Sequence, residues 1–333
     1  MVEVVTDRKM RAIICHRPIS PAALHVEEID LPAVPDDGML IRVHTSSANP
    51  VDMYATSLFA HIQRGRKPTV MGTDVAGTVE AVGANVTEFR PGDAVFGVAR
   101  GAFAQFVRVS GEHHLVRKPE GVSFEDAGTL GVAGSTALQA LRDHGQLQPG
   151  QRVLINGASG GVGTFAVQIA KALGAGEVTA VCSTRNIETA RAIGADTVID
   201  YTRDDFTRSR QRYDLMVDIA GSHSWSDCTR VLPKGATYVW VGAAAVQHGK
   251  GGMRRLLTQF AGMRVGSIGS GRRATSFIAK LKNDDLVFLA DLVASGRVQP
   301  VIEKRYDLAR VPEALEYIEA GHLRGKLAIA VRE

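Results

Sequence analysis

One stretch of the chain, residues 152–174, carries residue types and spacing suited to chemistry. It reads RVLINGASGGVGTFAVQIAKALG: a short apolar run, a cluster of glycines, and a run with helical character. Residues 157–161, GASGG, fit G-x-S-x-G, the turn that presents the serine nucleophile of hydrolases between a strand and a helix. Residues 158–163, ASGGVG, also fit A-x-G-x-x-G, a variant of the turn that holds a dinucleotide. The two interpretations predict different enzymes.

The hydrolase interpretation lacks its other parts. A nucleophilic Ser159 needs an oxyanion loop before it, whereas the HGGG-like run 248–252 follows it, and the strand before Ser159 is the first of its sheet. In a phosphate-binding turn, Gly160 lets the backbone approach the pyrophosphate and Gly163 lets the helix pack against the strand. The sequence therefore favours a dinucleotide site in which Ser159 is a turn residue. The predicted cofactor-binding residues of this turn are Gly160, Gly161, Val162 and Gly163.

The residues after the second expected strand indicate which nicotinamide cofactor the turn holds. An NAD site places an acid there for the ribose 2′-hydroxyl, but residues 182–186 read CSTRN and no acid occurs until Glu188. The guanidinium of Arg185 and the hydroxyl of Ser183 suit a 2′-phosphate. Tyr201, just past the third strand, can close over the same pocket. We therefore expect NADP(H), with a solvated loop arginine as the alternative.

The order of the elements predicts an α/β fold with two domains. The first 125 or so residues hold short strand-like runs and no sustained helical period, which is typical of a small β-barrel. From Asp126 onward six short apolar strands alternate with helices, and this pattern indicates a doubly wound parallel sheet whose last strand covers 264–269. Helical runs at 286–296 and 309–321 precede a strand at 326–331 that we expect to return to the first domain.

Composition and charge exclude several other classes of protein. The 333 residues are 45% hydrophobic with a net charge of +4, which suits a globular protein and is too weakly basic for one that binds nucleic acid. Cys15, Cys182 and Cys228 lie too far apart for a disulfide framework or a cysteine zinc lobe. We find no apolar leader and no long apolar run, so we expect a cytoplasmic protein without a membrane partner.

Five motifs together span nearly the whole chain. They are SSANPVDMY (46–54), GTDVAGTVEAVGANVTEFRPGDAVFG (72–97), NGASGGVG (156–163), GADTVIDY (194–201) and GKLAIAV (325–331). This combination resembles the medium-chain dehydrogenase/reductase superfamily, specifically its zinc-free quinone oxidoreductase branch, which includes zeta-crystallin. The resemblance implies a GroES-like β-barrel catalytic domain, a Rossmann domain for the cofactor, a cleft between them and a homodimer. The expected domains are 1–126 (catalytic), 127–271 (Rossmann) and 272–333 (return to the catalytic domain).

The resemblance also implies a site without a metal. Zinc-dependent relatives carry a cysteine ligand where this chain has Asn49 and a His-Glu pair where it has Thr73-Asp74, and neither Asn nor Thr is a competent zinc ligand there. By the family match, Asn49 and Tyr54 face the nicotinamide and the substrate, with Asn49 bonded to the acceptor oxygen and Tyr54 as proton donor. A helix-capping Asn49 and a packing Tyr54 are the alternatives. The residues that match positions lining the cofactor are Thr136, Gly242 and Lys326.

A metal-free site has a chemical consequence for the substrate. Hydride reduction of a simple carbonyl needs an electrophile for the developing alkoxide, whereas a quinone or enone delocalises that charge. We therefore expect an NADPH-dependent reductase of quinones or α,β-unsaturated carbonyls. One alternative is an enoyl-thioester reductase whose basic segment 254–273 holds a carrier phosphate, and another is an NADPH-binding protein without turnover. Some bacterial relatives hold the 2′-phosphate with a lysine where this chain has Asn186, which leaves that task to Arg185.

Overall fold

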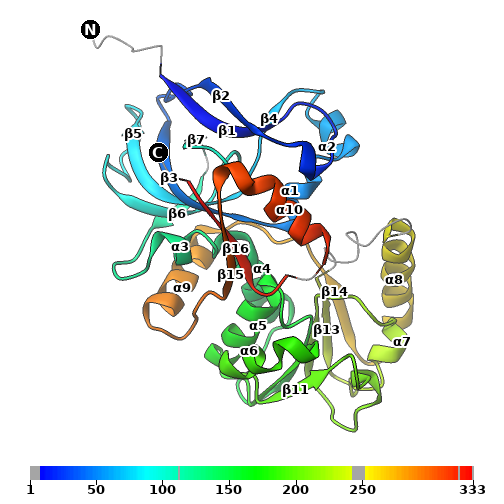
Figure 1. Cartoon of the computed structure of the whole chain (residues 1–333). Coiled ribbons are helices and arrows are strands. Elements are labelled where there is room, and N and C mark those ends of the chain that lie inside the picture. Colours follow the sequence, from blue (N-terminus) through cyan, green and yellow to red (C-terminus); the bar gives the residue numbers. More distant parts are fainter. Residues whose placement is uncertain (1–7, 112, 242–251, 322, 332–333) are drawn as a thin grey trace.

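The computed structural model describes residues 8–111, 113–241, 252–321 and 323–331. It confirms the expected α/β fold: a β-rich GroES-like domain lies above a Rossmann domain, and the C-terminal part of the chain runs between them (Figure 1). Each domain has a core of its own. Two apolar clusters lie in the β-rich domain, and two others pack against the two faces of the Rossmann sheet, one of which also includes Ala76, Phe96 and Val116 of the β-rich domain.

The catalytic domain is built on a seven-stranded sheet. Its long strand β3 (Gly38–Ala48) pairs antiparallel with β5 (Asp74–Val82) on one side and β16 (Lys326–Ala330) on the other, so the last strand returns to the first domain as predicted. The remaining strands of this sheet are β15 (Ile302–Asp307), β6 (Ala94–Val98), β8 (His114–Arg117) and β7 (Phe106–Ser110). A second sheet contains β2 (Val26–Asp30), β1 (Lys9–Cys15) and β4 (Thr69–Val70).

The Rossmann domain holds a six-stranded parallel sheet with the order β11-β10-β9-β12-β13-β14. In chain order this is 3-2-1-4-5-6, so the topology reverses between β9 and β12, and ligands of such sheets bind at the carboxyl ends of the strands at this point. The strands are β9 (Arg152–Asn156), β10 (Glu177–Cys182), β11 (Thr197–Asp200), β12 (Leu215–Asp218), β13 (Thr237–Trp240) and β14 (Arg273–Ser276).

Helices cover both faces of this sheet. The side chains of one face pack with α4 (Gly131–Gln139), α5 (Gly161–Ala172), α6 (Ile187–Ala192) and α9 (Asn283–Ala294). Those of the other face pack with α7 (Trp225–Cys228) and α8 (Gly252–Ser267). The other short elements are α3 (Phe124–Ala127), a π-helical turn at Ala140–His144 that continues α4, and 3₁₀ turns at Pro21–Ala23, Thr184–Asn186, Phe206–Arg208 and Leu308–Arg310.

The structure corrects the prediction of a strand over 264–269. Helix α8 continues through Ser267, and the sixth strand is β14, which begins at Arg273. The Rossmann sheet therefore extends beyond the predicted boundary at residue 271. Helix α9 packs in the Rossmann core as well, so the chain re-enters the catalytic sheet with β15 at Ile302 and not at residue 272.

The structure also contains two short helices that the strand-rich pattern of the first domain did not predict. They are α1 (Pro50–Tyr54) and α2 (Leu58–Gln63). The first begins directly after β3, with Pro50 at its first position and the Asp52 carboxylate accepting from the Asn49 N–H at 2.8 Å. Proline and a capping acid at these positions are recognised helix-start signals. Helix α10 (Val311–Glu319) then precedes β16.

Candidate active site

The glycine turn after β9 has the shape that a phosphate needs. An added Cβ at Gly163 would lie 2.1 Å from the Gly157 carbonyl oxygen, so only glycine lets α5 approach the turn. At Gly160 an added Cβ would meet nothing nearer than 3.9 Å, so the turn is open on that side. Gly160 caps α5 without a side-chain hydrogen bond, which leaves backbone N–H groups at the helix start for an anion. These residues fit the pyrophosphate of a dinucleotide.

The turn is tied directly to the catalytic domain. The Gly325 N–H donates to the Ser159 carbonyl at 2.8 Å, and Gly160 forms a parallel bridge with Gly325. An added Cβ on Gly161 would lie 3.1 Å from Cδ of Lys326. The start of β16 therefore lies against the phosphate turn, and Ser159 contributes a main-chain contact there.

Next to this junction lies a buried polar network around Asn49 and Lys326. The Lys326 ammonium donates to Asn49 Oδ1 at 2.5 Å and lies 3.4 Å from Oδ2 of Asp74. The Asn49 amide nitrogen donates to Asp74 Oδ2 at 2.9 Å and to the Ser47 carbonyl at 3.1 Å. Lys326 is only 2% exposed, and Asn49 and Asp74 are buried too. The structure thus brings two predicted site residues, Asn49 and Lys326, into contact.

Asp74 connects this network to the Rossmann domain. The Ser47 hydroxyl donates to Oδ2 of Asp74 at 2.5 Å, and the backbone N–H of Val132 in α4 donates to Oδ1 at 2.7 Å. Helix α4 approaches so closely that a Cβ on Gly131 would lie 2.6 Å from Asp74 Oδ1. These three neutral donors and the nearby Lys326 ammonium offset the free-energy cost of removing the Asp74 carboxylate from water.

Asp52 forms a second buried acid beside the first. It accepts from the Asn49 N–H and from the Thr73 hydroxyl at 2.9 Å. Burial, with the charge of Asp74 adding to it, raises the pKa of Asp52 to about 7. The predicted replacements for zinc ligands, Asn49 and Thr73, are therefore both engaged in hydrogen bonds to carboxylates.

The residues here do not offer a zinc site. Zinc in proteins is held by thiolate, imidazole or carboxylate groups, whereas an amide, a hydroxyl and an ammonium share these positions with Asp74. Over the described residues, no three His, Cys, Asp or Glu side chains gather in a way that could hold a metal ion. The fit of the chain to zinc is poor at the position where zinc-dependent relatives bind it.

Tyr54 lies apart from this network. It is 46% exposed, its hydroxyl donates to Oε1 of Gln63 at 3.0 Å, and its ring tilts against Phe59 at 6.1 Å between centroids. Thr136 lies in α4 with its hydroxyl bonded to the Val132 carbonyl. Gly242 lies outside the described residues. A direct role for Tyr54 in proton transfer stays a prediction.

The predicted 2′-phosphate residues lie together at the carboxyl ends of β10 and β11. Ser183 accepts from the Asn186 amide at 3.1 Å, Arg185 is exposed beside it, and Tyr201 is 60% exposed, with its N–H bonded to the Cys182 carbonyl. Asn186 is buried, and its Oδ1 has no hydrogen-bond partner among the residues that the structure describes. The three predicted residues therefore share one edge of the Rossmann sheet.

Sequence reasoning missed an acid at this edge. Asp200 ends β11, pairs in register with Cys182 of β10, and accepts from the Thr184 hydroxyl at 2.5 Å. That bond, with others from Thr202, lowers the pKa of Asp200, so it is charged at neutral pH. The signal was present in TVID (197–200), but only parallel pairing of strands two and three puts this acid beside Thr184.

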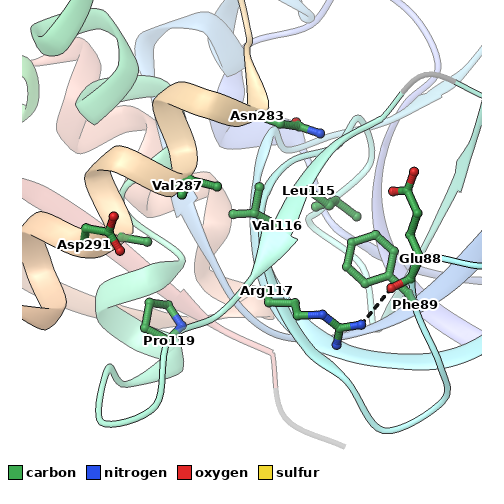
Figure 2. Close-up of a pocket in the computed structure, with 10 residues that line it drawn as sticks. Glu88, Phe89, Leu115, Val116, Arg117, Pro119, Asn283, Val287 and Asp291 are labelled. Carbon is green, nitrogen blue, oxygen red and sulfur yellow. Dashed lines mark hydrogen bonds between the residues drawn. The ribbon is translucent and has the colours of Figure 1, made fainter.

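A separate groove of about 460 Å³ lies between β8 and α9. Figure 2 shows Val116 of β8 facing Val287 of α9, with Leu115 on the other side of the strand and Phe89 beside Arg117. None of the predicted site residues lines this groove. The case for an active site therefore rests on the polar network at the glycine turn.

Comparison with known proteins agrees with this geometry. Residues 35–120 match the alcohol dehydrogenase GroES-like domain family, and residues 193–329 match the zinc-binding dehydrogenase family. The chain is 36% identical over 327 residues to the mitochondrial NAD(P)H oxidoreductase RTN4IP1 of Bos taurus, covering 88% of this chain and 81% of that protein. It belongs to the quinone oxidoreductase-like family of medium-chain dehydrogenases/reductases.

Other relatives of this oxidoreductase family span the chain as fully. The trans-enoyl reductase pgmF of Aspergillus terreus is 33% identical over 326 residues, which are 89% of this chain and 87% of that protein. The solved structure of the quinone oxidoreductase from Coxiella burnetii superposes with a TM-score of 0.83 at 28% identity, covering 98% of this chain and all of that one (100%). Together these similarities make the chain a nicotinamide-dependent oxidoreductase.

One further property of this oxidoreductase bears on its surroundings. Within the residues that the structure describes, every helix is too short or too polar to traverse a lipid bilayer.

Proposed function

We propose that this protein is an NADPH-dependent, metal-free reductase of quinones or α,β-unsaturated carbonyls. The observation that carries the proposal is the buried network at the phosphate turn: Asn49 and Thr73 stand at zinc-ligand positions, and Lys326 links Asn49 to the turn. A hydride donor bound at this turn would meet an acceptor beside an ammonium and an amide. Conjugated acceptors need the least further help, because the incoming negative charge delocalises within them.

Each part of the site has a distinct task in this reaction. The backbone N–H groups at the start of α5 hold the pyrophosphate, Gly160 makes room for it, and Gly163 lets α5 pack against the turn. Arg185 and Ser183 bind the 2′-phosphate, with Tyr201 over the same pocket. The bound nicotinamide supplies hydride to the acceptor. Asn49 has both amide hydrogens engaged, so it acts by holding Lys326 and Asp74 in place.

The names of similar proteins support the choice of acceptor. The Coxiella burnetii structure is of a quinone oxidoreductase, and the Bos taurus relative is described as acting with NAD(P)H. The Aspergillus terreus relative is a trans-enoyl reductase, which also reduces a conjugated double bond. A preference for conjugated acceptors is consistent with the names of the enoyl reductase and the quinone oxidoreductase, and the Bos taurus name specifies only the cofactor.

An enoyl-thioester reductase is the second candidate function, favoured by that relative. Its expected carrier-phosphate segment, 254–273, gives it less support. The Arg272 guanidinium donates to the carbonyls of Leu232, Thr229 and Ser270, and that of Arg273 donates to Gln146 and to the His144 carbonyl. Both guanidinium groups are therefore already engaged in hydrogen bonds within the protein, which gives a carrier phosphate less to bind.

A single screen tests the proposal. NADPH consumption is followed with quinones, enones and acyl thioesters, each with and without EDTA. We expect turnover with quinones or enones, no loss of rate in EDTA, and no inhibition by coenzyme A. Turnover confined to thioesters with coenzyme A competition would favour the second candidate, and NADPH binding without turnover would indicate a cofactor-binding protein. Loss of rate in EDTA, restored by zinc, would contradict a metal-free site.

A further inference from the structure

A positive charge occupies the neighbourhood where zinc-dependent relatives hold their metal. The zinc-ligand and acid positions of those relatives correspond here to Asn49 and Thr73-Asp74. The Lys326 ammonium lies 2.5 Å from Asn49 Oδ1 and 3.4 Å from Asp74 Oδ2. One cation, supplied by the chain itself, thus contacts two of these positions.

The backbone around Lys326 fixes where this charge lies. The Lys326 N–H donates to the Val301 carbonyl at 2.7 Å, and the preceding Gly325 N–H donates to Ser159. The aliphatic part of the side chain lies against Gly161 of the phosphate turn. The ammonium is therefore held between the proposed cofactor turn and the catalytic domain.

The hydrogen bonds of the network leave donor capacity on the lysine. Asp74 already accepts from the Ser47 hydroxyl, the Asn49 amide and the Val132 N–H. An ammonium has three N–H donors, and in the described protein its partners are Asn49 Oδ1 and Asp74 Oδ2. One N–H of Lys326 remains for a ligand. Because the side chain is buried, its charge acts in a medium that screens it far less than water does.

We propose that Lys326 is the electrophile of this active site: its ammonium donates a hydrogen bond to the acceptor oxygen and takes the place of the metal ion of zinc-dependent relatives. This rests on the proposed function. A reduced nicotinamide bound at the turn would supply a hydride, with its two electrons, to the conjugated carbon of the acceptor and would itself be oxidised, and the displaced π electrons would collect on the acceptor oxygen. Water would supply the proton that completes the reduction, which for an enone ends on the α-carbon, and Lys326 would keep its own proton.

This role differs from cofactor binding in what it predicts for different acceptors. Removal of one preorganised donor to an oxyanion lowers kcat about 10²- to 10³-fold. A simple enone localises more charge on its oxygen than a quinone does, so it depends more on the donor. Loss of a group that only binds the cofactor would reduce both reactions alike.

The test compares Lys326→Met with wild type, using 2-cyclohexenone and 1,4-benzoquinone as acceptors. We expect kcat for the enone to fall about 100-fold or more and kcat for the quinone to fall less than about tenfold. We expect the Kd of NADPH, titrated by fluorescence, to change less than about threefold. An equal fall for both acceptors, or a loss seen wholly in the Kd of NADPH, would overturn the proposal.

A binding measurement adds a readout that does not depend on turnover. 4-Nitrophenolate, a stable oxyanion, is titrated into the NADP⁺ complex by absorbance, and we expect at least tenfold weaker binding in Lys326→Met. Equal binding would contradict the proposed donor. Lys171→Met, which removes a surface lysine paired with Asp196 at the far end of α5, is the matched control and should behave as wild type.

Two further arms keep the test decisive. Lys326→Met leaves Asp74 buried beside an apolar group, so the double variant Lys326→Met/Asp74→Asn, which removes both charges, is measured as well. If Lys326→Met folds poorly, the double variant should still show a larger fall of kcat for the enone than for the quinone. If wild type reduces neither acceptor, the proposed function fails. If wild type reduces both and their ratio is unchanged in the variants, only the role of Lys326 fails.

Discussion

At the scale of single residues, Asp52 has the environment with the clearest consequence for stability. The carboxyl is fully buried, and burial raises its pKa from 3.8 to about 7. Between these values the folded protein holds a proton that the unfolded chain has released, so this group's contribution to stability falls as pH rises from about 4 to about 7. At roughly 1.4 kcal/mol per pKa unit, the effect amounts to a few kcal/mol.

Asp52→Asn should remove this pH dependence. An asparagine can accept from the Asn49 N–H through its oxygen and donate to the Thr73 hydroxyl through its nitrogen, so the fold is retained. We expect the stability difference between variant and wild type to shift in favour of the variant as pH rises from 4 to 7, and to level off above 7. Urea unfolding at four pH values measures it. A difference that stays constant with pH would contradict the raised pKa.

Arg185 should discriminate between the two nicotinamide cofactors. A hydrogen bond to a charged group contributes about 1.5–3 kcal/mol, so Arg185→Ala should weaken NADPH roughly 10- to 100-fold. NADH has no 2′-phosphate, and its affinity should change only about threefold. Fluorescence titration of both cofactors measures this. The ionised Asp200 at the same edge opposes a phosphate in wild type and variant alike, so it does not change this ratio.

A neighbouring arginine controls for general charge effects on that titration. Arg203 lies 3.8 Å from Asp200, and its side chain is 75% exposed. Arg203→Ala should leave both affinities within about threefold of wild type. Equal losses for NADPH and NADH in Arg185→Ala would mean that Arg185 does not recognise the phosphate.

At the scale of elements, the contact between β9 and α5 depends on one glycine. In Gly163→Ala the new methyl would lie 2.1 Å from the Gly157 carbonyl oxygen, so the helix has to move away from the turn. We expect NADPH affinity to fall at least tenfold and the melting temperature to drop. Gly262→Ala, at an exposed position in α8 with nothing within 4 Å, should leave NADPH binding unchanged. Normal binding by Gly163→Ala would contradict the phosphate-turn assignment.

The same elements show which features of the fold the sequence can predict. Buried parallel strands such as β9 and β10 are continuous apolar runs, and the glycine turn has a local pattern, so both are evident from the residues alone. Strand β14 reads RATS and has one neighbour in the sheet, and an edge strand needs little apolar character. The strand predicted at 264–269 has Val265 and Ile268 three positions apart, a helical spacing, and this segment is the end of α8.

The active site was predictable only in its local parts. Gly160 and Gly163 belong to one motif, whereas Lys326 and Asn49 meet across the whole length of the chain. Asp74 bonds to Val132 through a contact between two domains. Such pairings depend on tertiary structure, so composition and spacing carry no signal for them. The helix-start signal around Asn49 was present, but the helix that follows it, α1, has only five residues and is too short to show a helical period.

At the scale of the whole molecule, Gly325 joins the two domains at the cofactor turn. Its N–H holds the Ser159 carbonyl beside Gly160, and the following residue carries the buried ammonium. Its φ of +68° is a conformation that favours glycine, and an added Cβ would lie 2.0 Å from the Val301 carbonyl oxygen. Any side chain here must push β16 away from the phosphate turn or from the preceding loop.

Gly325→Ala should therefore weaken both the fold and the cofactor site, and Gly296→Ala isolates the part due to backbone strain. Gly296 has a φ of +70° and no atom within 4 Å of an added Cβ, so it should lose only about 1 kcal/mol of stability. We expect Gly325→Ala to lose about 2 kcal/mol more and to bind NADPH at least tenfold less tightly, while Gly296→Ala binds it normally. Urea unfolding and fluorescence titration of the two variants measure these effects. If both variants lose the same stability and keep wild-type affinity, the junction at Gly325 does not couple the catalytic domain to the cofactor turn.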